Sequence, residues 1–536
     1  MNKKISLDYL TVIASSVVYL LYTLMPFKKW LRLNNYRYEP FPDINIYSDS
    51  IYYLGQIREV INGNYSIGNP IIFENATDGF SYGNSSLFFI WGTIGRVLEL
   101  NLIQTYLLMV CVNSLALVLV LNAFYRMFYV NKIAIYLSLL LCLWLIGPLG
   151  RPSPTQQLLP ILLLTLILLL NQNRQEKSSK RFNINMSNVT FACCALILVL
   201  GNQFYSVFLA VLVVVSSIVI KKVSYFHFFT VIILNGFYFV WTKIKLMPAD
   251  NEIAERLGLH YTHLPGALVI TLPLLILIAI NTLLLFSSHF KKFIIKNNSV
   301  LPTKVYLVLN SSLLIALNSQ IFTGIALEME AHFLLVWYVL LGLNSCALLN
   351  YILEAYQKVK WIKIAEKLSF ISIIFVVIIY ANQFNKVQLN SSERTYLLEE
   401  ISNKNNIESV LIKANSEFSD LSDEVIALTD SYLYWEPFGK FSKMSKEDII
   451  SRFACTNVHL MDYKEFLKSE IAAPSRQIVN SIMQIESYNR FLRLFGVERT
   501  NLNFSNPSVD KYQIYVRKQQ ECSRGEFQFR VDKIID

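Results

Sequence analysis

The 536-residue sequence predicts a polytopic α-helical membrane protein with about eleven transmembrane helices and a C-terminal soluble α/β domain. Only 16% of the residues are charged, whereas soluble domains carry about 25%. The apolar residues are also gathered in long runs, such as 156–171, 205–220 and 265–287. Runs of this length match the hydrocarbon core of a bilayer, and they lack the polar stripe of a helix in a soluble core.

The apolar runs define the predicted transmembrane spans along the chain. We expect them at about 8–26, 103–123, 132–150, 156–171, 188–204, 205–220, 223–241, 265–287, 305–322, 333–353 and 367–383. The predicted transmembrane module covers residues 1–386 and includes a long external loop at 27–102. Residues 387–536 form the predicted α/β domain.

The net charge of +10 reflects membrane topology, because Lys and Arg gather in alternate short loops between the spans. The positive-inside rule assigns such loops to the cytoplasm, and five of them occur, around 126–132, 174–181, 221–222, 291–296 and 358–367. Basic residues at 28–32, after the first span, favour the opposite orientation and are outweighed. We expect a cytoplasmic N-terminus, an extracytoplasmic C-terminal domain and no nucleic-acid partner.

Within the first external loop, two segments show the periodicity of short amphipathic helices. Tyr53, Leu54, Ile57, Val60 and Ile61 share one helical face, and Gln56, Arg58 and Glu59 lie opposite. A similar apolar face recurs between Leu87 and Leu98. Both segments are predicted to lie on the membrane surface. The alternative, an extra span at 85–100, would invert the orientation of everything downstream.

The C-terminal domain is predicted from alternating helix and strand patterns. We expect helices at 391–404 and 445–454, the second capped by Ser445, and strands at 408–414, 424–429 and 511–517. This alternation is typical of a small α/β domain. Cys455 and Cys522 both fall on the predicted outer side, where a disulfide can form, and the sequence leaves open whether they meet.

Acidic residues gather in two external stretches. Asp43 and Asp49 follow the first span, and Asp49 could instead simply cap the helix that begins there. The second stretch, 318–332, contains Glu328, Glu330 and His332. Such groups near apolar helices are candidates for function, with a hydrated interfacial loop as the alternative.

Several basic residues on the predicted outer side could bind a phosphate. These are Arg58, Arg151, Lys243, Lys245 and Arg256. Arg58 could equally be part of the polar face of an amphipathic helix. The sequence contains no Walker loop, His-Glu-x-x-His or Gly-x-Ser-x-Gly motif, which leaves an ATP-driven transporter without support.

The first loop resembles the GT-C class of membrane glycosyltransferases, most closely its bacterial members. The resemblance rests on a carboxylate after the first span, a Tyr-rich amphipathic helix with Arg that ends at Asn62-Gly63, then Gly68-Asn69-Pro70 and Phe73-Glu74. It implies an enzyme of the bacterial cytoplasmic membrane that transfers a sugar from a polyprenyl-phosphate carrier to a lipid or glycan acceptor on the outer face.

By this resemblance Asp49 is the expected catalytic base, and Asp43 is the second choice. Arg58, Glu74, Arg151, Lys243, Arg256, Glu328, Glu330 and His332 are the expected substrate-binding residues. Ser50 follows Asp49 and interrupts the acidic pair that the family often has. The requirement for a divalent cation therefore stays open. The alternatives are a flippase or transporter for lipid-linked saccharides, and a polysaccharide polymerase or ligase.

Overall fold

The computed structural model describes the chain in segments. These are residues 12–24, 48–65, 71–72, 86–128, 131–175, 186–219, 224–246, 279, 303–317 and 329–355, and in the C-terminal part 396–397, 400–401, 408–413, 425, 429, 431–435, 444–466, 469, 471, 508–527 and 529–535.

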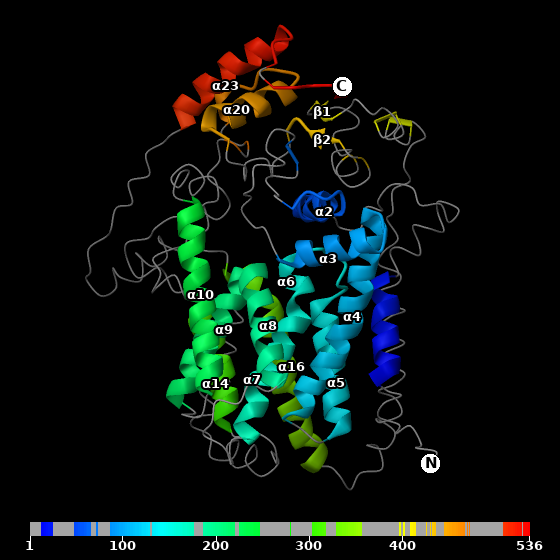
Figure 1. Ribbon diagram of the computed structural model, residues 1–536, viewed down its shortest axis with the longest axis vertical. Helices are drawn as coiled ribbons and strands as arrows, with labels where there is room; N and C mark the ends of the chain where they lie inside the picture. The colour runs from blue at the N-terminus through cyan, green and yellow to red at the C-terminus, as the bar shows by residue number, and fades with distance from the viewer. Residues whose placement is uncertain are drawn as a thin grey trace, which may run out of the picture.

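Apolar helices form a bundle that occupies the lower part of Figure 1. Its members are the helix Val12–Leu24, α4 (Leu102–Arg126), α5 (Lys132–Ile146), α7 (Leu159–Gln175), α8 (Met186–Gly201), α9 (Gln203–Val219), α10 (Tyr225–Leu246), α14 (Thr303–Leu317) and α16 (Met329–Ala355). Each coincides with a predicted span. The predicted spans 265–287 and 367–383 lie outside the described residues, apart from the helical Ala279.

Among the described helices, α4 alone is both long and apolar enough to cross a bilayer, at 25 residues. Apart from α4, the apolar helical stretches whose side chains the structure describes measure 10–17 residues, for example Tyr225–Tyr238 within α10 and His332–Ala347 within α16, whereas a crossing needs about 20. Local caps set some of these lengths. Asn131 caps the start of α5 through the Ile133 amide, and Gly147, at φ 72°, ends it after 15 residues. The described helices therefore do not support the count of eleven spans.

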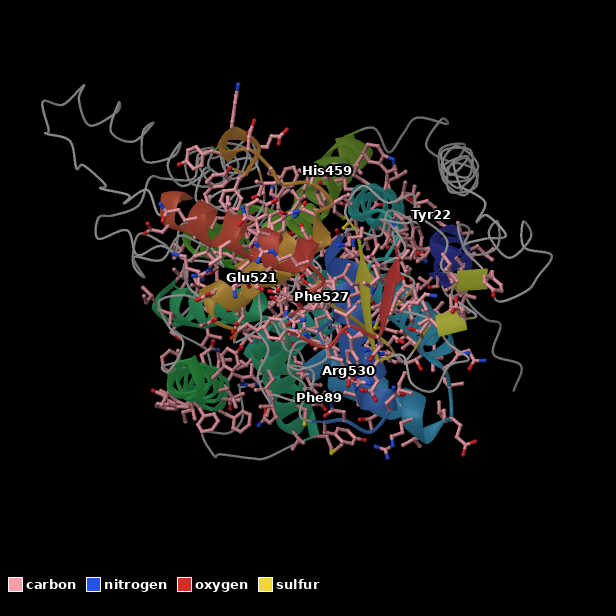
Figure 2. The ribbon with its side chains drawn as sticks, turned by 90° about the horizontal axis from the view of Figure 1, so that it is seen from above. Tyr22, Phe89, His459, Glu521, Phe527 and Arg530 are labelled. Atoms are coloured by element: carbon pink, nitrogen blue, oxygen red, sulfur yellow. A yellow bond between two sulfur atoms is a disulfide. The ribbon has the colours of Figure 1, made fainter. Side chains whose placement is uncertain are left out.

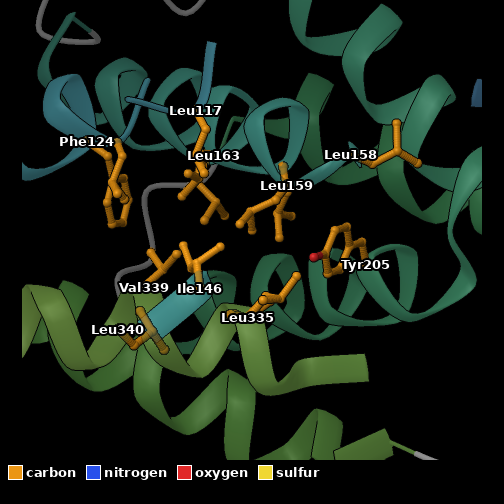
Figure 3. Close-up of a cluster of buried hydrophobic side chains, with 14 of the residues drawn as sticks. Leu117, Phe124, Ile146, Leu158, Leu159, Leu163, Tyr205, Leu335, Val339 and Leu340 are labelled. Carbon is orange, nitrogen blue, oxygen red and sulfur yellow. The ribbon is translucent and has the colours of Figure 1, made fainter. Parts of the chain in front are cut away.

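The bundle core joins helices that are distant in sequence. α5 packs against α16, α9 against α14, and α4 against α7. The Tyr125 hydroxyl of α4 donates to the Val339 carbonyl of α16 at 3.1 Å. Figure 3 shows the apolar side chains between these helices, including Leu117, Phe124 and Leu340.

Helices α2 (Ser48–Ile61) and α3 (Ser86–Val97) lie across one end of the bundle (Figure 1). We call this the covered end. Both helices were predicted, but the predicted surroundings of α2 are wrong. Gln56, Arg58 and Glu59 are 0%, 4% and 3% exposed, so the polar face of α2 is buried instead of facing water. The reason is that the C-terminal part of the chain lies over this face.

The described residues from 396 onward, here called the C-terminal unit, are built around a three-stranded parallel sheet of order β2-β1-β3. The strands are β1 (Ser409–Ile412), β2 (Tyr432–Leu433) and β3 (Lys533–Ile535), and the main helices are α20 (Lys446–Thr456) and α23 (Ser508–Ser523). The short helix α21 (Tyr463–Phe466) follows α20. From above, Glu521, Phe527 and Arg530 of this unit lie over the bundle (Figure 2).

The predictions for this unit are confirmed in part. β1 lies within the predicted strand 408–414, residues 396–397 and 400–401 are helical, and Ser445 caps α20 by accepting from the Asp448 amide at 3.1 Å. β2 and β3 were not predicted, because strands of two or three residues give almost no periodic signal.

Two predicted strands are wrong. The segment 511–517 belongs to helix α23, where Tyr512, Tyr515 and Gln519 follow helical spacing toward the core. In 424–429, Val425 is helical and its carbonyl accepts from the Thr429 amide at 3.1 Å. Short apolar stretches fit both periods, and here the tertiary packing favours the helical one.

Cys455 of α20 and Cys522 of α23 form a disulfide, with Cα atoms 5.2 Å apart. The bond joins the two helices beside a small core that includes Leu411 and Tyr434. The structure therefore answers the question that the sequence left open about this pair.

The core of the C-terminal unit extends beyond the predicted boundary at residue 387. Tyr52 of α2 together with Ile71 and Ile72 belongs to the same buried cluster as Val410 and Leu433. The Leu433 amide also donates to the Ile71 carbonyl at 2.8 Å. Part of the first loop is thus an integral piece of the C-terminal core.

Candidate functional site

The candidate site is the covered end of the bundle, where α2 and α3 cross it. Two hydrogen bonds mark this end: the Ser86 hydroxyl of α3 donates to the Ile197 carbonyl of α8 at 3.0 Å, and the Tyr106 hydroxyl of α4 donates to the Gly150 carbonyl. The turn 147–157 lies here, together with the start of α9 and the start of α16. Two of the predicted site residues, Arg151 and His332, belong to these segments.

A buried polar network holds the turn that carries Arg151. Ser153 caps α6 (Pro154–Gln157), and Pro154 occupies its first turn, where the missing amide hydrogen costs nothing. The Gln157 amide donates to the carbonyls of Leu149 and Arg151 at 3.0 and 2.8 Å and accepts from Asn113 at 2.7 Å. These bonds hold the backbone of Arg151 at the top of the bundle core.

His332 lies beside this turn. Its ring stacks on Phe204 with centroids 3.7 Å apart and an interplanar angle of 10°. The positive charge of Arg151 is near enough to act on the imidazole. The fold therefore places the turn that carries Arg151 beside the start of α16, which carries His332 and is distant in sequence.

Hydrogen bonds also hold the start of α9 in place at this end. Asn202 caps the helix by accepting from the Phe204 and Tyr205 amides at 3.0 and 3.2 Å. The buried Tyr205 hydroxyl donates to the Thr155 carbonyl at 2.5 Å, which ties α9 to the Arg151 turn. Phe204 is thus held as a fixed aromatic surface under His332.

Arg58 has a role in the structure that the sequence did not reveal. Its Nη1 donates to the carbonyls of Thr429 and Ser431 at 3.1 and 3.0 Å, and its Nη2 pairs with Glu59 at 2.9 Å. The guanidinium also lies over the Tyr432 ring, 4.9 Å from its centroid. These contacts join α2 to the C-terminal unit, and a phosphate bound to Arg58 would have to compete with them.

Asp49 is the second residue of α2, and its side chain lies outside the described part. The backbones of Lys243, Lys245 and Glu330 are in α10 and α16, and their side chains also lie outside it. The remaining predicted site residues fall outside the described residues altogether: Asp43, Glu74, Arg256 and Glu328.

Asn113, Gln157 and Gln56 are polar residues of this region that the sequence interpretation did not select. Asn113 interrupts the apolar run of α4, and Gln157 precedes that of α7. A polar side chain within such a run is costly unless it has a hydrogen-bond partner. This cost is the feature of the sequence that could have identified Asn113 and Gln157. Gln56 was assigned to a solvated face and is in fact fully buried.

The described residues contain no group of three or more His, Cys, Asp or Glu side chains that could hold a metal ion. Electrostatically, the covered end is shaped by Arg151 and by the buried Arg58–Glu59 pair. Burial raises the pKa of Tyr52 above its ordinary value, with a further contribution from Tyr53, so this hydroxyl is neutral and acts only in hydrogen bonding.

In the comparisons with known proteins, no protein-family model matches the chain, and no curated protein is similar to it.

Proposed function

We propose that the protein is a GT-C-like glycosyltransferase of the bacterial cytoplasmic membrane, which transfers a sugar from a polyprenyl-phosphate carrier to a lipid or glycan acceptor on the extracytoplasmic face. The observation that carries the proposal is the position of α2. This helix, with Asp49 in its first turn, lies across the same end of an apolar bundle at which the turn that carries Arg151 lies beside the start of α16, which carries His332.

The surface of the bundle supports a membrane location. Large apolar side chains are exposed along its helices, among them Leu21 at 57%, Ile218 at 68%, Ile233 at 62% and Phe237 at 69%. Lipid chains would cover these exposed side chains. The eleven crossings belong to this proposal, and two of them lie outside the described residues.

The orientation in the membrane is supported by two independent features. The C-terminal unit contains the Cys455–Cys522 disulfide, and disulfides persist in oxidising compartments outside the cytoplasm. In α4, the basic Arg126 ends a helix of 25 residues that begins at the covered end, which separates this charge from that end by about 36 Å. Basic residues are expected on the cytoplasmic side.

In the proposed reaction, a carboxylate at the covered end takes the proton of the acceptor hydroxyl. The hydroxyl oxygen forms a bond to the anomeric carbon of the sugar, and the bond from that carbon to the carrier phosphate breaks. The electron pair leaves with the phosphate. We assign the base to Asp49, with Asp43 as the second choice, and the stabilisation of the leaving phosphate to Arg151.

The test is transfer by membranes that contain the protein, with a panel of radiolabelled polyprenyl-phosphate hexoses and pentoses. We expect Asp49→Asn to reduce transfer by about 10²- to 10⁴-fold, the usual contribution of a general base. Asp510→Asn is the matched control, because Asp510 is an exposed carboxylate on α23. It should leave transfer unchanged.

Asp43→Asn is assayed in parallel. Full transfer by both Asp49→Asn and Asp43→Asn would refute the assignment of the base. Movement of labelled carrier lipid across the membrane without any transfer of sugar would instead support a flippase. Extension of a lipid-linked glycan by repeated units would support a polymerase.

A further inference from the structure

Helix α2 is buried on two sides by different parts of the molecule. Leu54 and Ile57 belong to the core of the bundle, whereas Tyr52 belongs to the core of the C-terminal unit. On the bundle side, α3 approaches closely, so that a Cβ on Gly92 would lie 2.5 Å from the Cβ of Val60. α2 therefore lies between the two parts, and we call the boundary at which the C-terminal unit packs against it the seam.

Asp49 and Gln56 occupy one row of positions along α2. At 100° per residue, positions 49, 52, 53, 56 and 60 form one row along an α-helix. In this row Tyr52 packs into the C-terminal core, and Tyr53 packs against both cores and stacks on Phe88 with centroids 5.4 Å apart. Gln56 follows one turn later in the same row.

The Gln56 amide is the unusual member of this row. Its side chain is 0% exposed, and neither its nitrogen nor its oxygen has a hydrogen-bond partner among the described residues. The amide lies near the Tyr52 hydroxyl without meeting hydrogen-bond geometry. An unsatisfied buried amide is costly, and an apolar residue of similar size would avoid this cost.

The chemistry of an amide limits the ligand that it would satisfy. A primary amide offers two donors and one acceptor oxygen without charge, which matches the hydroxyl groups of a sugar. The basic Arg151 near this end is better suited to phosphate. A neutral group two turns from Asp49 along one row is therefore suited to the sugar part of the donor.

We propose that Gln56 is a sugar-binding residue of the donor site, which forms hydrogen bonds to hydroxyl groups of the transferred sugar in the seam between α2 and the C-terminal unit. This inference rests on the proposed function and adds to it a specific residue and a specific part of the substrate. It also gives the C-terminal unit a role, since this unit forms one wall of the seam.

The test compares wild type with Gln56→Leu, which keeps the approximate volume and removes the amide. Binding is measured by the ligand-induced shift of thermal unfolding, with two probes: the polyprenyl-phosphate sugar that wild type transfers, and polyprenyl phosphate without a sugar. We expect the variant to bind the sugar-linked carrier about tenfold more weakly, the cost of about one hydrogen bond. Its binding of the sugar-free carrier should be unchanged.

The ligand-free unfolding temperature provides the internal control for folding. We expect it to be equal or higher in Gln56→Leu, because the unsatisfied amide is gone. Equal weakening with both probes, or no weakening with either, would overturn the inference while leaving the proposed function intact. If wild type neither binds nor transfers any sugar of the panel, the proposed function and this inference both fail. If Gln56→Leu folds poorly, Gln56→Asn serves as the second variant, because it keeps an amide on a shorter side chain. We expect its affinity for the sugar-linked carrier to be lower than that of wild type and higher than that of a variant without the amide.

Discussion

Replacing Arg58 by methionine should loosen the contact between α2 and the C-terminal unit. The guanidinium donates to the carbonyls of Thr429 and Ser431 and pairs with Glu59, and the two charged side chains are only 5% and 3% exposed. Methionine keeps most of the aliphatic stem and removes every one of these bonds. Among the described residues, the Glu59 carboxylate then keeps the bond from the Asn64 side-chain amide, at 3.1 Å.

The expected magnitude follows from the burial of the pair. Removing one partner of a buried ion pair costs about 3–5 kcal/mol, because the other charge stays buried without its partner. The two lost bonds to carbonyl groups are part of the same network, so their energies are not added separately. Since 1.4 kcal/mol corresponds to a factor of ten, the local opening equilibrium should increase at least about 100-fold.

The assay is amide hydrogen exchange measured by mass spectrometry on the purified protein in lipid nanodiscs. The reporter is the Leu433 amide, which bonds to the Ile71 carbonyl at 2.8 Å and should exchange faster when the contact opens. Arg517→Met is the matched control, because the Arg517–Glu447 pair is 57% and 49% exposed. An exposed pair contributes at most about 1 kcal/mol and lies away from this contact.

A second variant separates the loss of the arginine from the exposure of an unpaired charge. Replacing Arg58 by Met and Glu59 by Leu together should restore much of the protection, since the buried carboxylate is then absent as well. Unchanged exchange at Leu433 in Arg58→Met would refute the reasoning, because it would mean that the guanidinium does not hold the two parts together.

Two further predictions concern the C-terminal unit. Replacing Cys455 and Cys522 by serine should destabilise the unit by about 2–4 kcal/mol through the loss of a cross-link over 67 residues; limited proteolysis would measure this, and equal cleavage rates would contradict it. For Asp532, partial burial raises the pKa, but the hydrogen bond from Arg530, two backbone amides at the start of β1 and the Arg530 charge outweigh it, and the net pKa is lowered. Its contribution to stability is therefore present above the unfolded-state pKa of about 3.9 and is lost as the pH falls through the lower folded value. In Asp532→Asn, hydrogen exchange in β1 should therefore no longer show this loss of stability at acid pH. The same dependence of exchange on pH in variant and wild type would argue against this prediction.

Much of the helical module follows directly from local sequence. Nine predicted apolar runs coincide with described helices, because each is continuous and bounded by polar or basic residues. Capping residues were equally informative: Ser445 precedes α20 as predicted. The errors lie in short segments such as 511–517, where a few apolar residues fit both a strand and a helix.

The candidate site could be predicted only in part. Arg151 and His332 were selected from their chemistry near apolar helices, and the fold brings them together. Arg58 was selected for its charge, yet its donors bind carbonyl groups of the C-terminal unit. The periodicity of α2 predicts a solvated face for Gln56, because no local pattern indicates which segment covers this helix.

Sequence alone therefore specifies which segments of this protein are apolar helices and where many of them begin and end. These properties depend on hydrophobic periodicity and on hydrogen bonds between residues a few positions apart. The burial of the polar face of α2, the Cys455–Cys522 pair and the parallel pairing of β1 with β2 and β3 depend on tertiary packing. Such contacts join residues that are far apart along the chain, and a local pattern states that a face is polar or apolar without stating which segment packs against it.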